Sequence, residues 1–350
     1  MRTLLLITLT FAVTLLTGCG EKFELATDTD DFHYLLVEEA YLPIRVRGNT
    51  ASGKILLFVQ GGPGGSAIDF AEIDYPEWGN TLEAEYAVAY YDQRGTGNGQ
   101  GTYDAESISF AQYIEDIDQI VRFLAEKYPG TELYLMGHSF GGYLTMRYML
   151  DRGDDSPVAK YINLNGTASS DADPERWVFR RDWLLTIARE RIAANDESNY
   201  WTEVETYLLD HPVLDTLDEW RFWNQTVEEK IYPNYEDPPI TAGDAVDVLF
   251  TSPYNFFNTY LGYGHLDEVE QRLFDEWKAF RLVERLDEIT GPLLILTGRY
   301  DDGTPPEEVQ FIFDEISSID KEMVVLPEAG HYSFYHQPEL FMEAIRDWVE

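Results

Sequence analysis

The chain has little cysteine and few basic residues. Cys19 is the only cysteine among 350 residues, so no internal disulfide can form. The 25 Lys and Arg face 64 Asp and Glu, which gives a formal net charge of -39 at pH 7. Because a field of this sign repels phosphates, we expect no nucleic-acid partner. The excess of acidic residues either only forms a well-solvated surface or, in part, helps to select cationic substrates.

The N-terminal residues differ from the rest of the chain. Arg2 precedes an uncharged, mostly apolar run from Thr3 to Thr17, which is too short for a comfortable membrane span and predicts a signal peptide over residues 1–18. The ending Leu16-Thr17-Gly18-Cys19 resembles the lipobox of bacterial lipoproteins, in which the cysteine is lipidated. We therefore expect an exported protein, held on a bacterial membrane by that lipid, with an ordinary cleaved signal as the alternative. Gly20 favours the outer over the inner membrane.

Short apolar runs alternate with helical patterns after a polar tether over residues 19–31. Continuous apolar runs suit buried parallel strands. Helical patterns such as 109–130 lie between them and predict helices on both faces of a mostly parallel sheet, the α/β class. The stretch "HYLLVEEAYLPIRVRG" predicts an additional hairpin, and the apolar runs lie at 54–59, 86–92, 132–137, 159–166, 292–298 and 322–327.

A long segment interrupts this alternation. Residues 167–287 contain no convincing apolar strand, and about 120 residues exceed any ordinary connection. They predict a helical cap inserted between two parts of one core, 32–166 and 288–350. Six of the eight tryptophans fall in the segment; they either build a core for the cap or, as we favour for the set, also line an apolar pocket. They are Trp177, Trp183, Trp201, Trp220, Trp223 and Trp277.

The strand "ELYLM" runs into "GHSFGG" and then into a helical pattern. Gly137 to Gly141 fit G-x-S-x-G, and strand, sharp turn and helix are the context that a nucleophile elbow requires. Glycines are needed there because neighbouring backbones pass close to the turn. The pattern indicates that Ser139 is a catalytic nucleophile.

A serine nucleophile needs a base and a carboxylate that orients the base. His331, in the turn after the last predicted strand, is the best placed of six histidines, whereas His138 lies inside the elbow and His336 begins the final helix. The turn after the penultimate strand offers two carboxylates, Asp301 and Asp302. The chain order Ser, Asp, His is that of the α/β-hydrolase fold.

Five motifs carry a resemblance to a known family. In order, "QGGPGGS", "YYDQRGTGNG", "GHSFGGY", "GRYD" and "AGH", with a helical insertion before the fourth, resemble the proline iminopeptidase branch of the α/β-hydrolase serine peptidases. The resemblance implies that Asp301 is the catalytic acid. It also implies an oxyanion hole from the backbone N–H of Gly62, with Gly61 as the alternative, and from the N–H of Phe140.

Two positions bear on the substrate. The family begins its glycine motif with His, whereas this chain has Gln60, which can still support the loop by hydrogen bonds and is a candidate substrate-binding residue. The family reads the substrate's amino terminus with acidic residues, one of them at the position of Asp302; this residue could equally cap the helix that follows Thr304-Pro305. No metal-ligand cluster and no cofactor fingerprint stands out.

Three functions fit these observations. The leading hypothesis is a serine aminopeptidase that releases N-terminal proline, or another apolar residue, from short peptides. The second keeps the same residues but makes the substrate a small ester, lactone or amide, since the fold does not fix the leaving group. The third is a non-catalytic surface lipoprotein, against which the intact Ser139, Asp301 and His331 argue.

Overall fold

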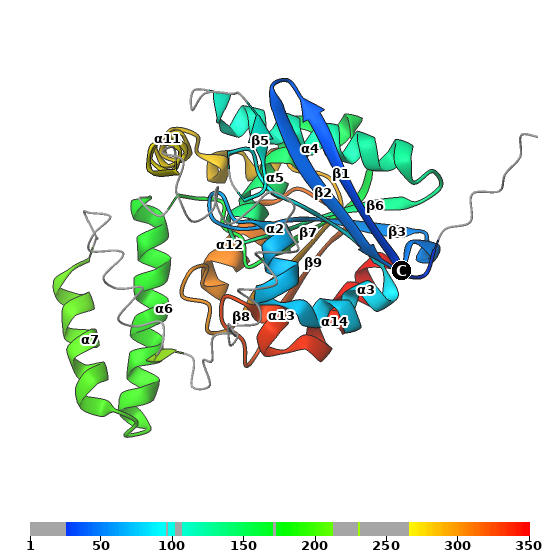
Figure 1. Cartoon of the computed structure of the whole chain (residues 1–350). Helices are drawn as coiled ribbons and strands as arrows, with labels where there is room; N and C mark the ends of the chain where they lie inside the picture. The colour runs from blue at the N-terminus through cyan, green and yellow to red at the C-terminus, as the bar shows by residue number, and fades with distance from the viewer. Residues whose placement is uncertain (1–25, 96, 102–106, 171–172, 213–229, 232–265) are drawn as a thin grey trace, which may run out of the picture.

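Within the described part of the chain, one sheet of nine strands forms the centre of the molecule (Figure 1). The computed structural model describes residues 26–95, 97–101, 107–170, 173–212, 230–231 and 266–350. The strand order is β1-β2-β4-β3-β6-β7-β8-β9, with the short β5 paired to β2. The neighbours in the series β4-β3-β6-β7-β8-β9 pair parallel. The pairs β1-β2, β2-β4 and β2-β5 are antiparallel. The strands are β1 (Thr29–Val37), β2 (Ala40–Gly48), β3 (Lys54–Val59), β4 (Ala87–Tyr91), β5 (Gln100–Gly101), β6 (Glu132–His138), β7 (Val158–Leu164), β8 (Leu293–Gly298) and β9 (Lys321–Leu326).

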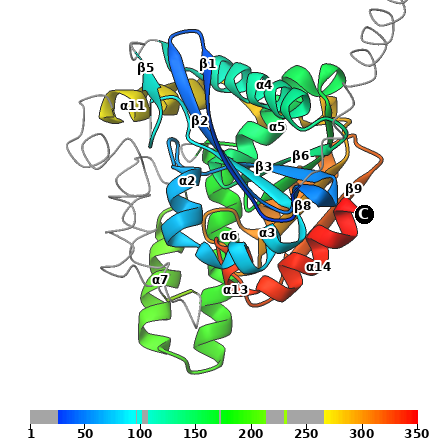
Figure 2. The same cartoon turned by 45° about the vertical axis from the view of Figure 1, so that its right-hand side comes forward.

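Helices cover both faces of the sheet. Figure 2 shows α3 and α14 side by side on one face and α4 on the opposite one. The first face also carries α2 and α13, and the second carries α5 and α12. The helices are α2 (Ala67–Asp69), α3 (Leu82–Glu85), α4 (Phe110–Lys127), α5 (Phe140–Arg152), α6 (Pro174–Ala193), α7 (Ser198–Asp210), α11 (Leu266–Ala279), α12 (Pro306–Glu315), α13 (Ser333–His336) and α14 (Pro338–Val349); the short 3-10 and π turns are η1 (Thr50–Ser52), η2 (Phe70–Asp74), η3 (Pro76–Asn80), η5 (Gly153–Asp155) and η6 (Leu282–Glu288).

The apolar runs explain why these strands are central. In β3, Ile55 and Leu57 belong to the core under α4 and α5, whereas Leu56 and Phe58 belong to the core under α14. Successive side chains point to opposite faces of a strand, so a continuous apolar run buries both faces. The helix α4 has its own signals: the Ser109 hydroxyl accepts from the backbone N–H of Gln112 and caps the first turn.

Helices α6 and α7 pack as an antiparallel pair beside the main body (Figure 1). Trp177, Trp183 and Trp201 are buried in the apolar core of this pair. Trp277 on α11 instead packs its ring 5.2 Å from the ring of Phe140, at the start of α5. Three tryptophans thus build the core of a helical pair, and a fourth contacts the residue that follows Ser139. Trp220 and Trp223 lie outside the described residues.

The predicted fold class is confirmed, and the six apolar runs agree with β3, β4, β6, β7, β8 and β9 to within two residues at each end. The hairpin begins four residues before the predicted His33, and the short β5 was not predicted. The boundary of the tether at residue 31 is wrong, because β1 begins at Thr29. Asp30 there is bound by Arg45 and Asp31 by the hydroxyl of Tyr128, which fixes these polar residues in the hairpin. Residues 1–18 and Cys19 lie outside the described residues. None of the described helices is both long and apolar enough to cross a membrane.

Candidate active site

Ser139 occupies a strained turn between β6 and α5. Its backbone has φ 54° and ψ -120°, which a non-glycine residue rarely adopts. The flanking glycines make this turn possible: a Cβ on Gly137 would collide with the carbonyl of Gly141, and a Cβ on Gly141 would collide with the carbonyl of Val59. The Ser139 N–H donates to Leu164 O at 2.9 Å, which ties the turn to β7. These contacts hold the turn in the form of a nucleophile elbow.

His331 and Asp301 form a pair at the same edge of the sheet. The two lie after β9 and β8, and His331 Nδ1 is 3.0 Å from Asp301 Oδ1. Asp301 is fully buried, whereas the His331 side chain is 20% exposed. The same Asp301 oxygen accepts from the backbone N–H of Thr304 at 2.8 Å, and its other oxygen accepts from Asn165 Nδ2 at 2.7 Å. The carboxylate is thus fixed in one orientation toward the imidazole.

The neighbouring imidazole and the hydrogen bonds to Asp301 together outweigh the effect of burial on its pKa. Burial alone raises the pKa of this carboxyl, but the neighbouring His331 and the hydrogen bonds from His331, Asn165 and Thr304 lower it, and the net pKa lies below its usual range. Asp301 is therefore ionised at neutral pH. An ionised carboxylate keeps the proton of a neutral imidazole on Nδ1 and leaves Nε2 as the basic nitrogen.

The glycine loop after β3 lies against Ser139. A Cβ on Gly61 would lie 2.9 Å from the Ser139 Cβ and 3.4 Å from its Oγ, so only a glycine backbone fits there. The Gly61 N–H donates to Gln60 Oε1 at 2.9 Å. Gly62 follows with φ 130°. The N–H of Gly61 is therefore bonded within the loop, whereas Gly62, the next residue, is exposed.

The motif "DQRG" supports this loop from the side. Gln93 donates from Nε2 to the carbonyl of Gln60 at 2.8 Å and accepts from the N–H of Gly64 at 3.1 Å. Asp92 accepts from the hydroxyl of Ser66 at 2.8 Å. Two side chains from the end of β4 thus fix both ends of the glycine loop.

The two candidate substrate residues are already engaged. The Gln60 amide bonds within its own loop and lies 3.4 Å from His138 Nδ1. Asp302 is 8% exposed, and one of its oxygens lies 3.8 Å from the guanidinium of Arg180 on α6. No side chain caps the first turn of α12, so the capping contact that we considered for Asp302 is not made; the backbone N–H of Thr304 instead bonds to Asp301.

Among the described residues, no three His, Cys, Asp or Glu side chains come together in a way that could hold a metal ion. The charged groups at this edge instead pair with one another. Arg176 binds Glu308 at 3.2 Å, and Arg180 lies near Asp302. Burial, together with the neighbouring Arg176, lowers the pKa of Arg180 to about 10, and Asp302 opposes that change.

Comparison with known proteins places the fold in a family. A family model described as alpha/beta hydrolase fold matches residues 54–338. The chain belongs to the α/β-hydrolase family. Relatives include a probable aminopeptidase, YbaC, of Bacillus subtilis, 21% identical over 86% of this chain and 91% of the relative. A proline iminopeptidase of Chitinophaga pinensis is 23% identical over 87% of this chain and 91% of the relative.

A solved α/β-hydrolase structure gives the same picture at the level of the fold. The esterase of Exiguobacterium antarcticum superposes with a TM-score of 0.57 at 18% identity, and the match covers 92% of this chain and 99% of that one. The sheet and its flanking helices are therefore those of the family. At these identities the relatives support a hydrolase activity, and the substrate is a separate question.

Some residues of this α/β-hydrolase site were not predicted from the sequence. Asn165 follows β7 without any motif, yet it binds Asp301. Gln93 lies in a motif of the resembled family, and its position next to Asp92 is the signal that could have pointed to it. Arg180 lies within α6, far from Asp302 in the chain and in no motif, so the sequence could not connect the two.

His138 joins the elbow to the loop that carries His331. Its Nε2 lies 3.0 Å from the carbonyl oxygen of His331 and must donate, because a carbonyl only accepts. Burial and the neighbouring His331 lower the pKa of His138 to about 3. Burial likewise lowers the pKa of His336 to about 4; its Nδ1 accepts from the N–H of Gly330. Both side chains are neutral in the folded α/β-hydrolase at neutral pH.

From the lowered pKa values of these two histidines we predict that acid destabilises the folded state. Below about pH 6.5 the unfolded chain protonates them, whereas the folded chain does so only near their lowered pKa values, so stability falls as the pH drops through this window. Each can contribute a slope of up to about 1.4 kcal/mol per pH unit. Urea unfolding between pH 7 and pH 4 measures the slope, and His138→Gln should make it shallower. An equal slope in that variant would contradict the prediction.

Proposed function

We propose that this chain is a serine hydrolase that works through an acyl-enzyme. One observation carries the proposal: the strained Ser139 elbow lies at the same edge of the sheet as a buried carboxylate bonded to an imidazole, His331 to Asp301 at 3.0 Å. In a neutral imidazole held in this way, Nε2 is the basic nitrogen that takes a proton from a hydroxyl. No other described feature of the site offers a general base of this kind.

The chemical steps follow from these positions. Ser139 Oγ attacks the acyl carbon while its proton passes to His331 Nε2, and Asp301 stabilises the resulting imidazolium. The oxyanion accepts hydrogen bonds from the backbone N–H groups of Gly62 and Phe140; we choose Gly62 because the Gly61 N–H is bonded to Gln60. The imidazolium then protonates the leaving group, which departs. A water activated by His331 releases the acid and restores Ser139.

The proposed substrate is a short peptide with proline, or another apolar residue, at its amino terminus. The resemblance of the five motifs supports it. Two relatives that match most of this chain are named a probable aminopeptidase and a proline iminopeptidase, which adds support. The aromatic rings of Tyr143 on α5 and Trp277 on α11 pack against Phe140, next to the nucleophile, which suits an apolar acyl group.

A second candidate is a small ester, lactone or amide, and one contact favours it. An aminopeptidase needs a free carboxylate to receive the substrate's ammonium group, but Asp302 already lies 3.8 Å from Arg180. A buried carboxylate near a guanidinium attracts a second cation less strongly than an unpaired one. A substrate without an ammonium group meets no such competition.

One panel of substrates separates the candidates. Purified protein is tested on proline and alanine arylamides, on the same compounds with blocked amines, and on p-nitrophenyl esters. Cleavage of the free-amine amides but not the blocked ones supports the aminopeptidase, and turnover of esters alone overturns it in favour of the second candidate. Absence of both turnover and labelling by a fluorophosphonate overturns the hydrolase itself and favours a binding protein.

We further propose that the protein is an exported lipoprotein anchored through Cys19, on the strength of the sequence "LLTGC" after an apolar run. Replacing Cys19 by alanine should release the protein from the membrane fraction, because the acyl chains that hold it attach to the thiol and to the new amino terminus. Cell fractionation and immunoblotting measure this. Equal membrane retention of the wild type and the variant would refute the anchor.

A further inference from the structure

Asn165 lies where three loops of the site meet. It follows β7, is fully buried and has φ 53°. Its Nδ2 donates to Asp301 Oδ2 at 2.7 Å and lies 3.3 Å from the carbonyl oxygen of Gly330. Its Oδ1 accepts from the hydroxyl of Ser333 at 2.6 Å. One side chain therefore contacts the loop after β8, the loop after β9 and the start of α13.

The chemistry of the partners fixes the orientation of this amide. An ionised carboxylate and a peptide carbonyl can only accept, so the NH₂ end must face Asp301 and Gly330. The Oδ1 end then faces the hydroxyl of Ser333, which can donate. The backbone of Asn165 is held as well: its N–H donates to Leu296 O at 2.7 Å, and its carbonyl accepts from Thr304 Oγ1 at 3.1 Å.

Only asparagine meets both demands of this position. A φ of 53° is unfavourable for residues with a Cβ, and among these asparagine and aspartate tolerate it best. Aspartate would face Asp301 with a second carboxylate in a buried place, and glycine has no donor. Asparagine combines the backbone conformation with an N–H that reaches the carboxylate.

We propose that Asn165 is a positioning residue for the acid of the triad, which fixes the rotation of the Asp301 carboxylate and tempers its basicity toward His331. The inference rests on the proposed serine hydrolase. Asp301 Oδ2 is occupied by Asn165, so Oδ1 is the oxygen presented to the imidazole. Without this donor the carboxylate holds its charge more locally and attracts the imidazole proton more strongly.

The proposal predicts the direction of a titration. Among the described residues, the titratable groups that act on His331 include Asp301 and Asp302 on the loop after β8, His336 on α13, His138 on β6 and the adjacent Tyr332, and Arg180 on α6 faces Asp302. Asn165→Gly removes a neutral donor and changes none of these charges. A more basic Asp301 stabilises the imidazolium, so the pKa of His331 should rise in the variant.

NMR of the full chain labelled with ¹³C and ¹⁵N in histidine measures this pKa directly, and the His331 signal is identified by its loss in His331→Gln. We expect His331 to titrate at least about half a pH unit higher in Asn165→Gly, and higher by a smaller amount in Ser333→Ala, which removes only the donor to Oδ1. The control is Asn163→Ala: Asn163 is equally buried on β7, but its Oδ1 accepts from the N–H of Gly166 instead of contacting the triad.

An unchanged His331 titration in Asn165→Gly, or a shift as large in Asn163→Ala, would overturn the proposal. If Asn165→Gly does not fold, Ser333→Ala decides: a rise supports the proposal, and the wild-type value overturns it. The titration needs no turnover. A wild-type protein without hydrolase activity would therefore refute the proposed function while this measurement still gives its own answer.

Discussion

Replacing Ser139 by alanine should abolish turnover of any substrate that the wild type accepts, with kcat lowered by at least about a thousandfold. In the proposed mechanism the hydroxyl oxygen of Ser139 is the protein atom that bonds to the acyl carbon, and the methyl group of alanine offers no replacement. The strained turn remains available, because its form depends on the close approach of Gly137 and Gly141 to neighbouring carbonyls. Steady-state kinetics and thermal unfolding of both proteins measure the effect.

Ser198→Ala is the matched control for this change. It removes a hydroxyl at the start of α7, in the helical pair whose separate core holds Trp201. Its kcat should equal that of the wild type. Residual turnover in Ser139→Ala of more than about one per cent, with no wild-type contamination, would contradict the assignment of the nucleophile.

Asp301→Asn should lower kcat by about 10³–10⁴ with little change in structure, because an amide cannot satisfy all of its neighbours. If the oxygen of the new amide faces His331 and Thr304, its NH₂ group meets the NH₂ group of Asn165, and two donors oppose each other. If the amide is reversed, its NH₂ group faces His331 Nδ1 and selects the wrong tautomer, with the proton on Nε2. The opposed donors disfavour the first orientation, and the second removes the general base.

The neighbouring carboxylate provides the control. Asp302→Asn also removes a buried negative charge, but Asp302 faces Arg180, whereas the imidazole bonds to Asp301. We expect this variant to keep kcat within about tenfold of the wild type and to change KM where the substrate carries a charge. A larger loss of kcat in Asp302→Asn than in Asp301→Asn would transfer the role of the acid to Asp302.

Local signals made the central part of the fold predictable. The run Lys54–Val59 reads as a buried strand because both of its faces are apolar, and the structure has β3 over the same residues. Ser139 is equally local: the strand, turn and helix around it are consecutive in the sequence. Features of this kind need no knowledge of distant residues, so composition and spacing are enough to predict them.

Contacts between distant residues explain what the sequence could not supply. Asn165 is separated from Asp301 by 136 positions and from Ser333 by 168, and no motif near Asn165 indicates either partner. Asp301 and Asp302 are adjacent, and residues alone could not separate their roles; the turn points one toward His331 and the other toward Arg180. The tether was predicted too long because its polar residues gain partners only when the hairpin forms.

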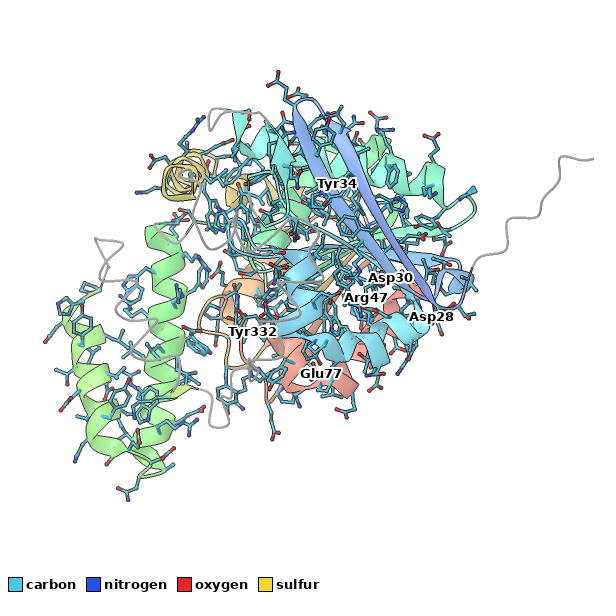
Figure 3. All side chains as sticks on the ribbon, in the orientation of Figure 1. Asp28, Asp30, Tyr34, Arg47, Glu77 and Tyr332 are labelled. Carbon is cyan, nitrogen blue, oxygen red and sulfur yellow. The ribbon has the colours of Figure 1, made fainter. Side chains whose placement is uncertain are left out.

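The register of the sheet fixes the direction in which the site opens. Thr29 pairs with Gly48, Gly48 with Ala87, and Ala87 with Ile55, so β1 begins level with the amino ends of β3 and β4. Ser139 and His331 follow the opposite ends of their strands. Figure 3 labels Asp28 toward the right of the main body and Tyr332, next to His331, further left, on the side that faces α6. The start of β1 and the approach to Ser139 therefore lie at opposite ends of the strands, and a substrate can reach the site without passing the point where β1 begins.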